Sequence, residues 1–122
     1  MRVLCVCSRG NVRSVNMAYL LREACEIEAA AIGYNSSTRS IRHSLFGWAD
    51  LVIVMDEGVA LQLKTDVTAQ VHREKIKHCL IGLDRSGVDW AFKHELLEDL
   101  KRWLEKNGVA VSGKPFVGGD RA

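Results

Sequence analysis

The sequence has no apolar stretch long enough to cross a membrane, and its apolar start runs into Cys7-Ser8-Arg9 too soon to form a signal peptide. It also lacks a strong charge of one sign, since 17 Lys and Arg residues against 15 Asp and Glu residues leave a net charge of +2. That charge is too small to predict binding to nucleic acid. These absences favour one globular domain that binds neither membranes nor nucleic acid.

Proline is almost missing, because the single proline lies in residues 109–122, together with three glycines. We predict that residues 1–108 form the domain, a length sufficient to bury a sizeable core. Residues 109–122 are predicted to form a C-terminal tail, either an extra edge strand or a flexible end.

The four cysteines have the spacing of neither a disulfide framework nor a zinc site. Cys5 and Cys7 share one face of a predicted strand and cannot readily bond to each other there. Cys25 lies on a helical pattern and Cys79 in an apolar strand, so both are predicted to be core residues. We therefore expect free thiols and no metal site, and the sequence implies no cofactor. A thiolate works best in a reducing compartment, so we expect the protein in the cytoplasm.

Apolar strand-like runs alternate with amphipathic helical patterns along the chain. Strands are predicted over residues 1–6, 29–34, 51–55 and 76–81, and helices over 14–28, 38–48, from 56 onward, and 92–106. Thr38 is predicted to cap the second helix, and Asp56-Glu57 to open the third. This alternation predicts an α/β fold, a three-layer αβα sandwich around a four-stranded parallel sheet.

A polar loop follows the first strand, and its residue types suit phosphate chemistry. Cys7 ends the strand, Gly10 and Asn11 favour a turn, and Arg13 and Ser14 begin a helix. A loop that enters a helix aims backbone N–H groups at one point, where the helix dipole favours an anion. The same field stabilises a thiolate on Cys7, and the planar fork of Arg13 suits phosphate oxygens. Ser14 is placed to donate its hydroxyl to the sulfur.

A bare Cys-x5-Arg match is a weak signal, so the context decides how it is interpreted. The alternative is that Cys7 is a buried cysteine at the end of a core strand and Arg13 a solvated residue at a helix start. The preceding strand, the following helix, the internal glycine and the serine after the arginine favour the phosphate-binding interpretation.

At these residues the chain resembles the low-molecular-weight protein tyrosine phosphatases, whose signature is an apolar strand, Cys-x5-Arg-Ser and a helix. Residues 48–57 resemble the central strand of that family, and residues 83–90 lie where it carries its general-acid loop. The resemblance implies a flavodoxin-like fold with a phosphate-binding loop after strand 1. It implies a phosphocysteine intermediate on Cys7, phosphate binding by Arg13, and a phosphorylated protein or small phosphate monoester as substrate. The backbone of Ser8, Arg9, Gly10, Asn11 and Val12, with Ser14, then lines the phosphate site.

The resemblance also implies a carboxylic acid that protonates the leaving oxygen. Asp89 is our choice, because Asp89-Trp90 best matches the acid and aromatic of the family, and Asp84 is the alternative. Each could instead be a solvated or helix-capping aspartate. Trp90 and Tyr34 are candidate cleft aromatics. Arg39 and Arg42 either extend a positive rim or lie on a solvent-facing side of a helix.

The chain departs from the family pattern at several positions. Gly10 and Asn11 stand one position later than the corresponding family residues, and Val12 replaces a frequent second cysteine. The acid loop has no proline, and the region before Trp48 is short.

Other functions therefore stay open. They are a non-catalytic phosphate- or phosphoprotein-binding module on the same fold, a phosphotransfer domain with a cysteine carrier, and, with less support, an arsenate reductase, which needs further cysteines as a relay. The sequence specifies neither the physiological substrate nor an oligomeric state.

Overall fold

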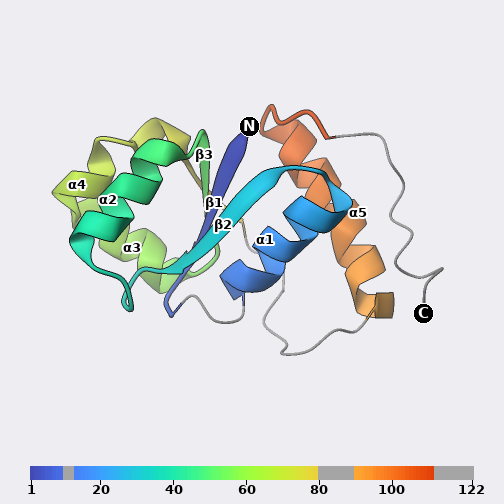
Figure 1. Cartoon of the computed structure of the whole chain (residues 1–122), viewed down its shortest axis with the longest axis horizontal. Helices are drawn as coiled ribbons and strands as arrows, with labels where there is room; N and C mark the ends of the chain where they lie inside the picture. The colour runs from blue at the N-terminus through green and yellow to red at the C-terminus, as the bar shows by residue number, and fades with distance from the viewer. Residues whose placement is uncertain (10–12, 80–89, 112–122) are drawn as a thin grey trace.

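The computed structural model describes the backbone of residues 1–9, 13–79 and 90–111, and the side chains of these residues except 90–96. Helices and strands alternate along this part of the chain (Figure 1). In order they are β1 (Arg2–Cys7), α1 (Arg13–Ala24), β2 (Glu28–Gly33), α2 (Arg39–Trp48), β3 (Leu51–Val54), α3 (Glu57–Thr65), α4 (Val67–Gln70), η1 (Arg73–Lys75), β4 (Ile76–His78) and α5 (Trp90–Lys106). None of the helices within these ranges combines the length and apolar character needed to cross a bilayer.

The four strands form one parallel sheet in the order β2-β1-β3-β4, which confirms the predicted α/β fold with a four-stranded parallel sheet. In the register, Cys7 lies opposite Gly33 of β2, and Val6 opposite Val54 of β3. Because all strands run the same way, their carboxyl ends share one edge. From β1 the chain goes to β2 on one side of β1, and it then crosses to β3 on the other side. The strand order therefore switches at β1, and parallel sheets bind ligands at such a switch.

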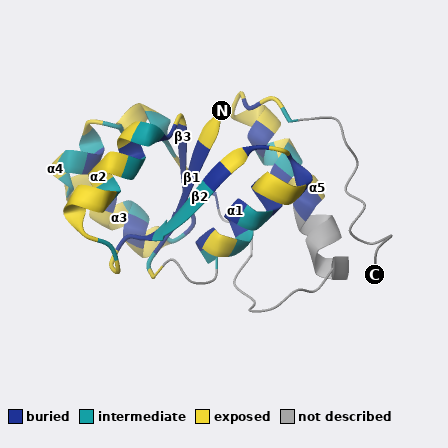
Figure 2. Ribbon diagram, viewed as in Figure 1, coloured by how far each residue is buried: buried dark blue, intermediate teal, exposed yellow. Residues whose placement is uncertain are grey.

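Side chains from the two faces of the sheet enter two separate hydrophobic clusters. Val3 and Cys5 of β1 pack into the cluster that α1 and α5 cover. Leu4 and Val6 pack into the cluster that α2, α3 and α4 cover. The ribbons show these two groups of helices on opposite sides of the strands, and β1 is buried along most of its length (Figure 2). This arrangement is compatible with a flavodoxin-like αβα fold.

Side-chain caps fix where two helices begin, as the sequence predicts. The hydroxyl of Thr38 accepts a hydrogen bond from the Ile41 N–H at 3.2 Å and caps α2. The carboxylate of Asp56 accepts from the N–H groups of Gly58 at 2.7 Å and Val59 at 3.2 Å and caps α3. Such caps satisfy backbone donors that have no partner within the helix. The cap of α3 places Asp56 directly after β3, at the carboxyl edge of the sheet.

The first helix is shorter than the predicted 14–28, because α1 ends at Ala24. Glu26 takes a left-handed backbone conformation with φ of 56°, and the Ile27 N–H bonds to Leu21 O at 2.9 Å across the helix end. Ile27 is buried in the core, but it lies after the point where the chain leaves the helix. Its apolar side chain continues the helical spacing of the sequence, and the predicted helix is therefore too long.

The C-terminal boundary of the core also differs from the sequence pattern. Gly108 ends α5 with φ of 80°, as a glycine after a helix often does. Val109 is nevertheless buried in the α1–α5 cluster, and its N–H bonds to Leu104 O at 2.9 Å. The core therefore takes in Val109, which is the first residue of the predicted tail.

A partly buried hydrogen-bonded link joins the end of β2 to the start of α4. The Tyr34 hydroxyl donates to Asp66 at 2.5 Å, and the same carboxylate accepts from the N–H groups of Thr68 at 3.0 Å and Ala69 at 3.3 Å. Burial alone would raise the pKa of Asp66, but these hydrogen bonds outweigh it and hold the pKa below its usual value. Burial, and then the bond to Asp66, raise the pKa of Tyr34, so the phenol stays a donor.

We expect Asp66→Asn to lower the free energy of unfolding by about 1 kcal/mol at pH 7, because asparagine can still cap α4 but carries no charge. A carboxyl whose pKa is lower in the folded state stabilises the fold above the unfolded-state pKa and loses this effect as pH falls through the folded-state pKa. The difference between wild type and variant should therefore shrink below about pH 4. Urea unfolding at several pH values measures it, with exposed Glu98→Gln as the charge control. A difference that stays constant down to pH 2 would contradict this role of Asp66.

Candidate functional site

Cys7 lies at the carboxyl end of the central strand β1, where the strand order switches. Its Sγ atom is 3.1 Å from the hydroxyl oxygen of Ser14, on the first turn of α1, and Ser14 is fully buried. The Cys7 carbonyl accepts a hydrogen bond from the Tyr34 N–H at 2.8 Å, which fixes the backbone of the strand end. The sequence predicted this contact between hydroxyl and sulfur, and the structure brings the two side chains together.

Arg13 is the first residue of α1 and reaches across the switch point to the end of β3. Its Nη1 atom donates to Met55 O at 3.1 Å, and its Nη2 atom lies 4.0 Å from the Asp56 carboxylate. The Arg13 side chain is 42% exposed, so one side of the guanidinium faces the protein and other N–H donors remain accessible. These contacts hold the guanidinium at the carboxyl end of β3, the strand that pairs with β1.

Asp56 is a site residue that sequence reasoning recognised only as a helix opener. One carboxylate oxygen caps α3, and the other faces Arg13. Asp56 directly follows β3, the strand next to β1. Its place after a predicted strand is the signal from which the sequence could have predicted Asp56 at the site.

The turn after β2 holds the backbone that follows Cys7. The Asn35 N–H donates to Ser8 O at 2.8 Å, and the Asn35 side-chain amide donates to the Ser8 hydroxyl at 2.9 Å. The Ser36 hydroxyl donates to Arg9 O at 2.8 Å. The sequence predicted a strand before these residues and a helix after them, and gave them no role, although β2 ends at the same edge of the sheet as Cys7.

Gly33 allows this turn to approach closely. A Cβ atom at this position would lie 2.2 Å from the carbonyl carbon of Arg9 and 2.2 Å from the Ser36 hydroxyl oxygen. Only glycine therefore fits between β2 and the backbone of Arg9.

The predicted site residues are described to different extents. Cys7, Arg13 and Ser14 lie together, Ser8 is half-buried beside them, and Arg9 is exposed. Tyr34 is buried, with its hydroxyl on Asp66, so its ring is less open to a ligand than a cleft aromatic should be. Predictions for the remaining positions lie outside what the structure describes, namely Gly10, Asn11, Val12, Asp84, Asp89 and the side chain of Trp90.

The other three cysteines differ from Cys7 in their surroundings. Cys5, Cys25 and Cys79 are buried within the α1–α5 cluster, of which Cys7 is not a member. Burial raises the pKa of the Cys5 and Cys25 thiols, which favours their neutral form. Among the four cysteines, Cys7 is therefore the one at the carboxyl end of β1, where its sulfur contacts the Ser14 hydroxyl.

Taken together, these contacts place a thiol, a hydroxyl and a guanidinium at the carboxyl edge of a parallel sheet, the edge at which such sheets bind ligands. Such a set can attack an electrophile that carries oxygen anions, with the guanidinium holding the oxygens. Among the described residues, no three His, Cys, Asp or Glu side chains come together as a metal site. The chain matches no protein-family model, no curated protein and no solved structure.

Proposed function

We propose that the protein hydrolyses phosphate monoesters, with phosphotyrosine in proteins as its substrate, through a phosphocysteine on Cys7. The observation that most supports this proposal is the 3.1 Å contact between Cys7 Sγ and Ser14 Oγ, with Arg13 adjacent at the start of α1. On this proposal the fold is a flavodoxin-like three-layer αβα sandwich, and residues 8–13 form the phosphate-binding loop. The activity belongs in a reducing compartment, where the thiolate stays free.

In the first step the Cys7 thiolate attacks phosphorus and the ester P–O bond breaks. The backbone N–H groups of residues 8–13 and the Arg13 guanidinium stabilise the charge on the phosphoryl oxygens. The carboxylic acid of Asp89 gives its proton to the leaving oxygen, with Asp84 as the alternative acid. Ser14 donates its hydroxyl to the sulfur, which stabilises the thiolate before attack and as it leaves.

In the second step a water molecule attacks the phosphocysteine. The aspartate that lost its proton takes one from this water, the P–S bond breaks, and the thiolate and inorganic phosphate are released. Each group thus returns to its starting state without a redox step.

The test is hydrolysis of p-nitrophenyl phosphate by the reduced protein in the presence of a metal chelator. We expect turnover by wild type and roughly a tenfold lower kcat for Asp89→Asn, since p-nitrophenol leaves readily and needs only modest help from an acid. The matched variant Asp84→Asn should keep wild-type kcat. If Asp84→Asn alone is slow, the mechanism stands and the acid is Asp84.

No turnover between mildly acidic and mildly basic pH would contradict the proposed hydrolysis. The chain would then fit the second candidate, a module that binds phosphoproteins without catalysis. Binding of a phosphotyrosyl peptide, with the unphosphorylated peptide as control, would test that function directly.

A further inference from the structure

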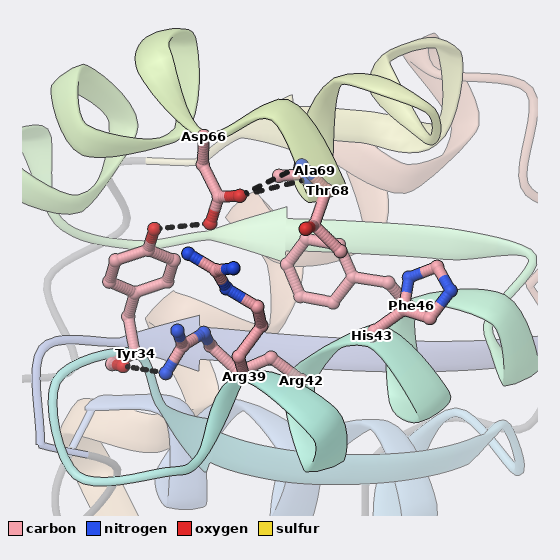
Figure 3. A pocket seen from close by; sticks show the side chains of 8 residues that line it. All are labelled: Tyr34, Arg39, Arg42, His43, Phe46, Asp66, Thr68 and Ala69. Carbon is pink, nitrogen blue, oxygen red and sulfur yellow. Dashed lines mark hydrogen bonds between the residues drawn. The ribbon is translucent and has the colours of Figure 1, made fainter.

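An open hollow of about 430 Å³ lies on the sheet face that α2, α3 and α4 cover. Its lining includes Tyr34 at the end of β2, two arginines of the first turns of α2, and polar side chains of α3 and α4. These residues are Tyr34, Arg39, Arg42, Gln62, Thr65 and Thr68. A small pocket of about 10 Å³, enough for roughly one water, shares several of them and is drawn in Figure 3.

Two residues that line the hollow are linked by hydrogen bonds to Cys7 and Ser8 at the end of β1. Gln62 donates to the Asn35 side chain at 3.1 Å, and Asn35 in turn donates to the Ser8 hydroxyl at 2.9 Å. The Tyr34 N–H bonds to Cys7 O at 2.8 Å. A ligand that occupies the proposed phosphate site is therefore close to the hollow.

The two arginines differ in how strongly the protein holds them. Arg42 donates from Nη1 to Tyr34 O at 2.9 Å and to Ser37 O at 2.5 Å, and its guanidinium lies 4.6 Å from the centre of the Tyr34 ring. Arg39 is exposed, and its side chain makes no hydrogen bond or ion pair with the part of the chain that the structure describes. Figure 3 shows both side chains extending from α2 towards Tyr34 and Asp66.

The one carboxylate that lines the hollow is already engaged. Asp66 accepts hydrogen bonds from the Tyr34 hydroxyl and from the N–H groups of Thr68 and Ala69. Two guanidinium groups thus face one carboxylate that has three donors of its own. The hollow keeps an excess of positive charge, and Arg39 is the group that can give a bidentate hydrogen bond to a further anion.

We infer that this hollow binds an acidic side chain of the substrate, with Arg39 pairing with its carboxylate. The inference rests on the proposed function, because it names the substrate class as phosphotyrosyl peptides with Glu or Asp beside the phosphotyrosine. Arg42 supplies positive charge from a fixed position, and Gln62, Thr65 and Thr68 supply neutral hydrogen-bonding groups around it.

The test compares two phosphotyrosyl peptides that differ only in having glutamates or glutamines on both sides of the phosphotyrosine. We expect wild type to show a kcat/KM about threefold to fivefold higher for the glutamate peptide at low salt, the range for an exposed ion pair. Arg39→Gln should remove this preference and leave hydrolysis of p-nitrophenyl phosphate unchanged. The preference of wild type should shrink at about 0.5 M salt, because salt screens exposed charges.

Arg73→Gln is the matched control, because Arg73 is an exposed arginine of η1, before β4 begins at the amino edge of the sheet. It should keep the full preference. Equal kcat/KM for both peptides with wild type, or a preference that survives Arg39→Gln, would overturn the inference while p-nitrophenyl phosphate hydrolysis still supports the proposed function. Absence of p-nitrophenyl phosphate hydrolysis would instead remove the proposed function itself, and the inference with it.

Discussion

Replacing Cys7 by serine is expected to lower kcat for p-nitrophenyl phosphate by at least about 10⁴-fold. A serine hydroxyl stays protonated at neutral pH, whereas the proposed reaction begins from a thiolate. Serine has nearly the shape of cysteine and can still hydrogen-bond to Ser14, which lies 3.1 Å from the sulfur in the wild-type protein. The variant should therefore fold and bind phosphate while it fails to form a covalent intermediate.

Two measurements separate a lost nucleophile from a lost fold. Acid quenching during turnover should leave wild type with a mass higher by one phosphoryl group, and should leave Cys7→Ser unmodified. Circular dichroism and urea unfolding should show a folded variant. Cys5→Ala is the matched control, because Cys5 is buried two residues earlier on the same strand and contributes only to the core. A Cys7→Ser protein with more than a few per cent of wild-type kcat would rule out the phosphocysteine.

The parts of the fold that the sequence predicted are those with a strong local signal. The buried run of β1 and the alternation of strands with helices indicated a parallel sheet, and Thr38 and Asp56 marked helix starts through their capping side chains. The elements that were missed, α4 and η1, are short, and Val67 and Val71 there are exposed. A helix of one turn has no apolar stripe, so hydrophobic periodicity could not reveal it.

In the candidate site too, a contact between residues close in sequence was predicted, and contacts between distant residues were not. Cys7 and Ser14 are seven residues apart, and a strand followed by a helix was enough to predict their contact. The partners of Arg13 at Met55 and Asp56 lie more than forty residues away. They meet Arg13 only because β3 pairs with β1, which depends on the strand order. Sequence spacing alone carries no information on that pairing.

The close approach of the β2 turn to the backbone after Cys7 follows from the same strand order. β2 lies against β1 on the side opposite β3, so the turn after Gly33 meets the backbone of Ser8 and Arg9. Three hydrogen bonds from Asn35 and Ser36 then hold the first residues of the proposed phosphate-binding loop. The positions of Ser8 and Arg9 therefore depend on a glycine of a neighbouring strand, a residue without a side chain.

Replacing Gly33 by alanine is expected to have the second largest effect. The new Cβ would lie 2.2 Å from the carbonyl carbon of Arg9 and 2.3 Å from its oxygen, so the backbone of Arg9 must move by more than about 1 Å to reach ordinary contact distance. A displacement of this size beside a reacting group costs about 100-fold in rate, and overpacking costs about 1–3 kcal/mol of stability. We therefore expect kcat/KM for p-nitrophenyl phosphate to fall at least about 100-fold.

The chain offers a matched control in Gly47→Ala. A Cβ at Gly47 would meet nothing within 4 Å, and Gly47 lies within α2, where alanine is the better helix former. This variant should keep wild-type kcat/KM and should unfold at an equal or higher urea concentration.

Ser36→Ala tests the turn after β2 without adding an atom, because it removes only the hydrogen bond to Arg9 O. Ser36→Ala should fold, and its kcat/KM for p-nitrophenyl phosphate should fall by a smaller factor than that of Gly33→Ala. The role of the turn therefore stays testable even if Gly33→Ala fails to fold. Wild-type activity in both Gly33→Ala and Ser36→Ala would show that the turn after β2 does not position the loop that follows Cys7.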